Sequence, residues 1–205
     1  MITAQEMMEL EHNAVQNGIP ISQLMENAGR KVFDVIEEKY DIRDKHVIVF
    51  AGHGNNGGDG FVAARHFAKE SFVTILFFGW EENLTEEARE NYNTIKDTIP
   101  IIAITTQEDL ETFRIQNNLN VILIDALLGT GVQGTIREPV SYGIDYFNSL
   151  SGIKVAVDIP SGLDADTGEM LNKYCGADLI ICFHDVKKGL ENLDNVIVVD
   201  IGLIY

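Results

Sequence analysis

Seven short apolar runs recur along this chain and constrain its fold more than any other feature. They span residues 46–52, 72–79, 101–105, 121–129, 154–160, 178–183 and 195–202. Short, nearly continuous runs rich in valine and isoleucine are typical of strands buried on both faces of a sheet. Helical signals separate most of the runs, for example Thr85 ahead of the apolar positions Ala88, Tyr92 and Ile95. This alternation predicts a mostly parallel sheet with right-handed crossovers and helices on both faces.

Two helices are expected ahead of the first strand. Thr3 and Glu6 have the spacing of a capping box, and Ile2 and Met7 could form the accompanying hydrophobic staple. A second helix is expected from Ser22, because apolar residues repeat there every four positions, at Leu24, Ala28, Val32 and Ile36. The expected fold is therefore α/β, a Rossmann-like three-layer sandwich with two leading helices. The last two strands follow each other without an obvious helix between them.

Length and composition favour one domain over residues 1–205. A chain of 205 residues can bury a substantial core, and no linker or repeat divides it. No apolar run approaches the roughly 18 residues needed to span a bilayer, and residues 1–12 lack the basic start and apolar core of a secretory signal. Cys175 and Cys182 show neither metal-ligand nor CxxC spacing. We expect a cytoplasmic protein with reduced thiols and no membrane partner.

The strongly acidic composition bears on possible ligands. A net charge of −17 repels a phosphate backbone, so no nucleic-acid partner is expected. A negatively charged nucleotide would need local help from backbone N–H groups, a helix N-terminus or a bound cation. The charge is equally compatible with a solvated surface that has no such ligand.

Ligands of open α/β sheets bind beyond the carboxyl ends of strands, so the residues after each run are the candidates. The first such segment, residues 51–60, contains a literal GxGxxG pattern in Gly52, Gly54 and Gly57, followed by a helix expected at residues 61–70. These glycines could approach a phosphate or simply form a tight turn. The polar side chains of Asn55, Asn56 and Asp59 exceed what a structural turn needs.

The second segment, residues 125–135, begins with a carboxylate at the end of an apolar strand. Asp125 is costly there unless it is paired, hydrogen-bonded or bound to a cation, and its alternative role is to cap the following turn. Glycines and threonines then form a backbone-rich loop at residues 129–135, which suits phosphate or ribose contact but could also be a plain crossover. This segment is a candidate for both cation and nucleotide binding.

The third segment, residues 158–168, repeats the same design. Asp158 ends a strand, Pro160 stiffens the exit, and Ser161 adds a hydroxyl group directly beyond it. Asp158 is the candidate general acid/base, although it could merely accept backbone hydrogen bonds in the turn. Asp164 and Asp166 are expected to be turn residues.

The five histidines show no zinc spacing, and no serine nucleophile elbow or Cys/His pair is present. His53 lies within the glycine-rich segment, where it could line a pocket or stay solvated. Hydrolytic chemistry based on an activated serine or cysteine is therefore not expected.

Together the motifs GNNGGDG (54–60), DALLGTG (125–131) and DIPSGLDADTG (158–168) closely resemble the NAD(P)H-hydrate epimerase family, which includes the apolipoprotein A-I binding protein. The resemblance covers essentially the whole chain, including LMENAG at 24–29. It implies an isomerase that interconverts the R and S forms of hydrated NADH and NADPH, so that a separate dehydratase can complete the repair. It also implies a homodimer.

The resemblance assigns residues to two kinds of site. One potassium ion per subunit would be held by Asn56, Asp125 and Ser161, and hard oxygen ligands suit such an ion. Asp158 would be the catalytic residue and would also contact substrate. The remaining implied substrate contacts are Asn55, Asn56, Gly57, Gly58, Asp59, Gly129, Thr130, Gly131, Val132, Gln133, Gly134 and Thr135.

Two features limit what the resemblance implies. Residues 182–190, CFHDVKKGL, depart from the family's usual proline-bearing turn, so neither Lys187 nor Lys188 is assigned a role. The sequence ends at Tyr205, soon after the last strand, so we expect epimerisation without a fused dehydratase. Either loss of water from the ring or ring opening could invert the hydrated carbon.

Two other functions are compatible with the same fold. A scaffold domain used for dimerisation would not need Asp125, Asp158 and the intact 54–60 motif. A nicotinamide-dependent dehydrogenase would use the glycine pattern conventionally, with Glu81 or Glu82 on the ribose hydroxyls, but no second substrate domain follows. The epimerase interpretation accounts for more of the polar residues than either alternative.

Overall fold

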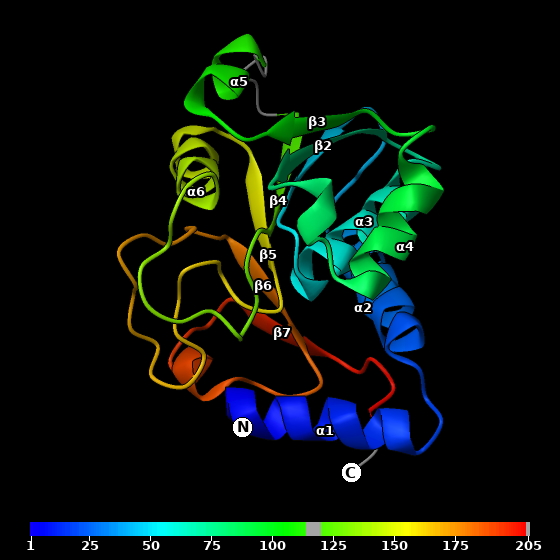
Figure 1. Cartoon of the computed structure of the whole chain (residues 1–205), viewed down its shortest axis with the longest axis vertical. Helices are drawn as coiled ribbons and strands as arrows, with labels where there is room; N and C mark the ends of the chain where they lie inside the picture. Colours follow the sequence, from blue (N-terminus) through cyan, green and yellow to red (C-terminus); the bar gives the residue numbers. More distant parts are fainter. Residues whose placement is uncertain (114–119, 204–205) are drawn as a thin grey trace.

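A computed structural model describes residues 1–113 and 120–203 and contains one seven-stranded sheet (Figure 1). The strand order is β3-β2-β1-β4-β5-β6-β7, and every neighbouring pair is parallel. The α/β sandwich expected from the sequence is confirmed. The strands are β1 His46–Ala51, β2 Phe72–Phe78, β3 Ile101–Ile104, β4 Val121–Ala126, β5 Ile153–Val157, β6 Leu179–Phe183 and β7 Val196–Val199. Tyr205, where the sequence ends, lies outside the described residues.

Helices cover both faces of the sheet. One layer holds α2 (Ile21–Lys39), α3 (Asn55–Phe67) and α4 (Glu86–Ile95), and the other holds α5 (Gln107–Thr112) and α6 (Val140–Ser149) (Figure 1). Alternate β1 residues serve the two layers, because successive side chains of a strand point to opposite faces. Val47 and Val49 join the core under α2 and α3, whereas Ile48 and Phe50 join the core under α6. This double burial explains the continuous apolar runs.

The last two connections contain no α-helix. Residues 158–178 join β5 to β6, and residues 184–195 join β6 to β7 with only the short 3₁₀ helix η2 (Lys188–Leu190). A smaller apolar cluster fills the space under these loops and includes Ala156, Ile180 and Leu190. Parallel neighbours need a long crossover but not necessarily a helical one, and here largely irregular segments provide the crossover.

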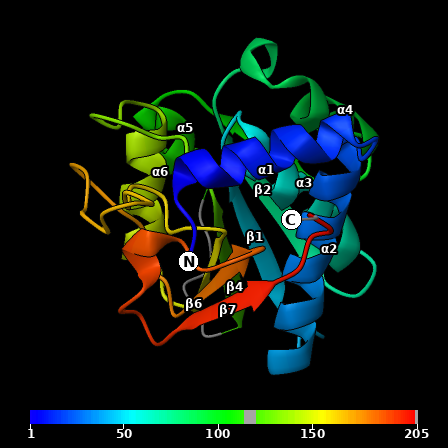
Figure 2. The same cartoon turned by 90° about the horizontal axis from the view of Figure 1, so that it is seen from below.

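The helix α1 (Ala4–Gln16) crosses the carboxyl edge of the sheet (Figure 2). The predicted capping box is confirmed, since Thr3 and Glu6 exchange hydrogen bonds at its start. Ile2 forms a parallel bridge with Lys187 in the segment after β6. Residues distant in sequence therefore meet where the strands end. Among the described residues, no helix is both long and apolar enough to cross a membrane.

Two predicted helix starts are corrected. The second helix begins at Ile21 rather than Ser22, with Pro20 at its N-cap. The helix expected at residues 61–70 begins at Asn55, so the glycine-rich motif is its first turns and not a loop. Glycine disfavours isolated helices, but close packing requires it here. A Cβ on Gly57 would lie 2.0 Å from the Gly52 carbonyl oxygen, and one on Gly60 would lie 2.7 Å from Cβ of Ala126.

Candidate active site

The chemistry-bearing segments meet at the carboxyl edge of the sheet. Chain connections run outward in both directions from β1 and β4, so the switch point lies between these strands. Ligands of open parallel sheets bind in the crevice outside such a point. The segments that follow β1, β4 and β5 all reach it, as their hydrogen bonds show.

Asn56, Asp125 and Ser161 lie in one connected network. Ser161 donates from its hydroxyl to Oδ1 of Asp125 at 2.6 Å and from its backbone N–H to Oδ2 at 2.8 Å. The Asn56 amide donates to the Leu128 carbonyl at 2.9 Å, and the Leu128 N–H donates to the Ser161 hydroxyl at 2.8 Å. The structure thus brings together the three residues expected to hold a cation.

Asp125 is fully buried and has no ion pair with any described residue. Burial raises the pKa of Asp125, and hydrogen bonds from Ser161 and the Leu127 N–H oppose part of that rise. A buried carboxylate without a cationic partner is expensive. The surrounding donors are amide, hydroxyl, carboxylate and carbonyl oxygens, which suit a hard cation. The residues present therefore fit the potassium ion that the family resemblance implies.

The loop at residues 129–135 starts beside this network and is exposed over much of its length. A Cβ placed on Gly129 would lie 3.4 Å from Cβ of Asn56, so there the backbone passes close to the network. The far end is fixed by Asn172, which exchanges hydrogen bonds with the backbone of Ile136. A loop that is held at both ends and exposed in the middle suits contact with an extended nucleotide. The side chains of this loop do not identify a particular nucleotide.

Asp158 follows β5 directly and is 8% exposed. Its Oδ1 accepts a hydrogen bond from the Phe183 N–H at 2.9 Å and an ion-pairing hydrogen bond from Lys187. Its φ of 63° lies in the left-handed region, which aspartate and asparagine tolerate better than most residues. Such a conformation costs free energy and persists where the surroundings impose it. Asp158 therefore does more than accept the backbone bonds of a turn.

Lys187 is the functional candidate that the sequence analysis missed. Its side chain is fully buried, and Nζ donates both to Asp158 and to the Phe183 carbonyl. Burial by itself lowers the pKa of Lys187, but attraction to Asp158 and Cys182 and hydrogen bonds to both together outweigh burial, so this pKa lies above its ordinary value. The available signal was a lysine placed soon after a buried strand end, where an unpaired ammonium group would be costly.

Two further carboxyl groups face the ion pair of Asp158 and Lys187. Asp59 near the start of α3 is 9% exposed, and Glu11 on α1 is partly buried. Burial raises the pKa of Asp59 well above its ordinary value, and the charges of Asp158 and Glu11 raise it further. Burial, followed by repulsion from Asp158, also raises the pKa of Glu11. Three carboxyl groups thus share one buried cation.

Several other candidates have different roles. Asn55 is exposed, and its side-chain oxygen accepts a hydrogen bond from Thr85 at the start of α4. His53 is also exposed. Glu81 accepts a hydrogen bond from the Tyr92 hydroxyl at 2.7 Å, so its carboxylate is already engaged. Asp164 orders its own turn by accepting two backbone N–H bonds, as expected.

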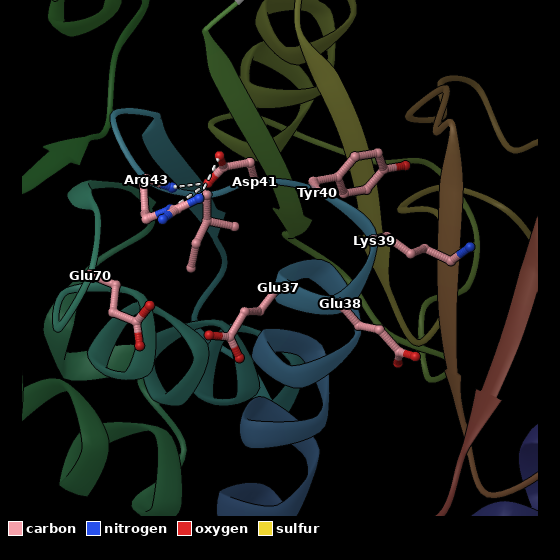
Figure 3. A pocket seen from close by; sticks show the side chains of 8 residues that line it. Glu37, Glu38, Lys39, Tyr40, Asp41, Arg43 and Glu70 are labelled. Carbon is pink, nitrogen blue, oxygen red and sulfur yellow. Dashed lines mark hydrogen bonds and ion pairs between the residues drawn. The ribbon is translucent and has the colours of Figure 1, made fainter.

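A pocket at the end of α2 lies away from these residues (Figure 3). Most of its lining residues come just before β1 in the chain, so the pocket lies at the amino edge of the sheet. Asp41 and Arg43 pair with each other at its rim, and its lining carries exposed charges of both signs. The pocket is lined by Glu37, Glu38, Lys39, Tyr40, Asp41, Ile42, Arg43 and Glu70. None of these is a predicted site residue.

Comparison with known proteins identifies the family of this chain. Residues 21–189 match the family described as YjeF-related protein N-terminus. The NAD(P)H-hydrate epimerase of Nitrosopumilus maritimus is 37% identical over 192 residues, covering 92% of this chain and 87% of that protein. The chain belongs to the NAD(P)H-hydrate epimerase family. The resemblance inferred from the three motifs is confirmed.

Other family members differ in length. The NAD(P)H-hydrate epimerase of Cenarchaeum symbiosum is 36% identical and matches over 87% of its length. The bifunctional NAD(P)H-hydrate repair enzyme of Pyrobaculum aerophilum is 40% identical, but the match covers only 38% of that enzyme. The crystal structure of the yeast protein ynu0 has a TM-score of 0.82 over 98% of this chain at 24% identity. That likeness supports the fold.

Proposed function

We propose that this protein is an isomerase that interconverts the R and S forms of hydrated NADH and NADPH. The observation that carries the proposal is the buried carboxylate of Asp158, ion-paired with Lys187 at the carboxyl edge of the sheet. Membership of the NAD(P)H-hydrate epimerase family supports the substrate class. A dehydrogenase or a scaffold would leave this charged arrangement unexplained.

The site has separate parts for binding and for chemistry. The 129–135 loop and the N-terminus of α3 offer backbone N–H groups to the nucleotide, and helix N-termini favour phosphate. The residues Asn56, Gly57, Gly58 and Asp59 lie on the buried first turns of that helix. Asp158 lies further along the same edge, after β5. The phosphates and the nicotinamide ring would therefore meet different strand ends.

The inversion follows from the structure of the substrate. Its hydrated carbon carries a hydroxyl group beside the ring nitrogen. Protonation of that hydroxyl expels water as the nitrogen lone pair forms a ring cation, and water can then return to either face. Asp158 takes part in this proton transfer as general acid/base, a role that typically contributes about 10² to 10⁴-fold. Ring opening is the competing route.

The first prediction is that the purified protein accelerates interconversion of the two hydrates. The reason is that a fixed general acid/base replaces slow proton exchange with water. Chromatographic separation of the R and S forms after incubation measures the rate in both directions. Conversion no faster than in buffer alone would contradict the proposed function.

We also propose that Asn56, Asp125 and Ser161 hold one potassium ion. The buried carboxylate of Asp125 and the oxygen donors around it support this assignment. When bound, the ion would supply positive charge that an acidic chain otherwise lacks beside an anionic nucleotide.

The second prediction is that potassium stabilises the protein specifically. A ligand that binds only the folded state raises the free energy of unfolding by RT ln(1 + [L]/Kd), so the thermal midpoint should be higher in potassium chloride than in choline chloride of equal ionic strength. Ser161→Ala should lose this difference. The exposed Ser149 bonds only to its own helix, and Ser149→Ala should keep it.

Crystals soaked in thallium provide a direct check on the same site. Anomalous density is expected between Asn56, Asp125 and Ser161. Absence of that density, together with equal midpoints in the two salts, would remove the ion from the proposal.

The remaining proposals concern the context of the enzyme. We propose that it supplies the S form to a separate NAD(P)H-hydrate dehydratase, as the combined name of the bifunctional relatives suggests. The family resemblance supports a homodimer, which sedimentation velocity would detect. The two free, buried cysteines are compatible with a cytoplasmic location, which cell fractionation would test.

A further inference from the structure

The two aspartates nearest the ion pair have opposite environments. Asp158 accepts hydrogen bonds from the Phe183 N–H and from Lys187. Asp59 is similarly buried, but its carboxyl group accepts no hydrogen bond from residues 1–113 or 120–203. A cationic partner favours the ionised form of a carboxyl group, whereas burial without one favours the protonated form. The same site therefore holds one ion-paired aspartate and one aspartate whose protonated form is favoured by its surroundings.

The groups around Asp59 reinforce this difference. Asp158 faces it from the end of β5 and Glu11 from α1, and both repel a negative charge on Asp59. Lys187, from the segment after β6, is the one cation that the described residues bring near. Its ammonium group is already bonded to Asp158 and to the Phe183 carbonyl. Among the described residues Asp59 thus accepts no hydrogen bond, and the attraction of Lys187 offsets only part of the rise in the pKa of Asp59.

Inverting a carbon by loss and return of water requires two proton transfers on opposite faces of the ring. The departing hydroxyl needs a proton on one face of the ring, and the incoming water must lose a proton on the other. One carboxyl group serves both faces only if it or the ring moves. Two carboxyl groups in opposite protonation states meet the requirement without such a movement.

Resting on the proposed epimerase function, we propose that Asp59 is the second catalytic residue, a proton donor that works opposite the ion-paired Asp158. Asp59 gives its proton to the hydroxyl, the carbon–oxygen bond breaks, and the electron pair leaves with water. The ring nitrogen forms a double bond to that carbon. A water on the other face attacks the carbon and passes one proton to Asp158. In the reverse direction the two residues exchange roles. Before another forward turnover Asp158 loses its proton to solvent and Asp59 gains one from solvent, which restores the starting state.

Asp59 and Asp158 reach this edge from different elements. Asp59 lies near the start of α3, the helix that follows β1, whereas Asp158 follows β5 directly, and β4 lies between these two strands in the sheet. An acid and a base on either side of a ring need room for the attacking water, and in inverting glycosidases such groups are about 6.5–9.5 Å apart.

The third prediction is that Asp59 is protonated in the resting enzyme at neutral pH. Infrared spectroscopy of the whole protein without substrate detects the carbonyl stretch of a carboxylic acid. The band should disappear in Asp59→Asn and persist in Asp97→Asn, which changes an exposed aspartate after α4. Asp59→Glu keeps an acid at this position but should shift the band, and it serves as the test if the asparagine variant does not fold.

The same variants report on catalysis. Asp59→Asn exchanges one neutral group for another of similar shape, so its thermal midpoint should match that of the wild type. Its epimerisation rate should nevertheless fall by about 10² to 10⁴-fold in both directions. Asp97→Asn should keep the wild-type rate.

The results separate this inference from the proposed function. A wild-type protein without epimerase activity would remove the function and the catalytic role of Asp59 together. An active wild type whose infrared spectrum is unchanged in both Asp59→Asn and Asp59→Glu would overturn the protonated donor alone. An active wild type and a fully active Asp59→Asn would likewise overturn the donor while leaving the epimerase intact.

Discussion

Replacement of Asp158 with asparagine is expected to slow epimerisation by about 10² to 10⁴-fold, because it removes the proton-transfer group and keeps the shape of the side chain. Asparagine can still accept hydrogen bonds from the Phe183 N–H and Lys187, and it tolerates the left-handed backbone at φ 63°. Substrate binding should therefore change little, but the thermal midpoint should fall, because the Lys187 ammonium group stays buried without its carboxylate partner. The rate of R and S interconversion and the thermal midpoint measure these two effects.

The matched control is Asp164→Asn. Asp164 Oδ1 accepts the N–H groups of Asp166 and Thr167 within its own turn, and an asparagine oxygen can accept the same bonds. We expect little kinetic change there. A reduction of less than about threefold in Asp158→Asn, far below the usual contribution of a general acid/base, would exclude the catalytic role. Loss of activity in the control alone would mean that the wrong carboxylate has been assigned.

Replacement of Lys187 with methionine is expected to be the most destabilising change at the site. It would leave Asp158 charged, buried and without its cation, and breaking a buried ion pair in this way typically costs about 3–5 kcal/mol. Activity should also fall, because Lys187 holds the Asp158 carboxylate in position. Urea denaturation followed by circular dichroism measures the free energy of unfolding.

Two comparisons test the cause of that loss. Lys188→Met changes the adjacent lysine, which is exposed, and should alter stability by less than about 0.5 kcal/mol, as is usual for surface positions. The double variant Lys187→Met/Asp158→Asn should regain much of the lost stability, because no unpaired charge stays buried. Equal losses in Lys187→Met and Lys188→Met would mean that the ion pair contributes nothing.

The candidate site was predictable where its residues follow strands. Asp125, Asp158 and Ser161 stand out in the sequence as polar residues next to apolar runs, and the structure places Asp125 and Ser161 in direct contact. Strand ends of a parallel sheet share one edge, so their proximity follows from the order of the chain. The potassium ion and the substrate contacts remain predictions.

The burial of Lys187 and the surroundings of Asp59 were not predictable in this way. Lys187 follows a strand but appears in sequence as one of two adjacent lysines, and lysines are usually solvated. Only the packing of α1 and residues 184–187 at the sheet edge shows that Lys187 is buried and Lys188 is not. That Asp59 accepts no hydrogen bond from residues 1–113 or 120–203 is likewise a property of its three-dimensional neighbours.

The sequence by itself determined the fold class. Continuous apolar runs alternating with helical segments require strands buried on both faces, and the strand-to-helix order permits few topologies. It did not determine where α3 begins. Glycine's weak helix propensity favours a loop at residues 54–60, but the close approach of Gly57 to the Gly52 carbonyl leaves no room for a side chain. Tertiary packing therefore decided that these glycines are helical, and it also decided which charges are buried, because the free energy of a buried charge depends on neighbours that the chain brings together only when it folds.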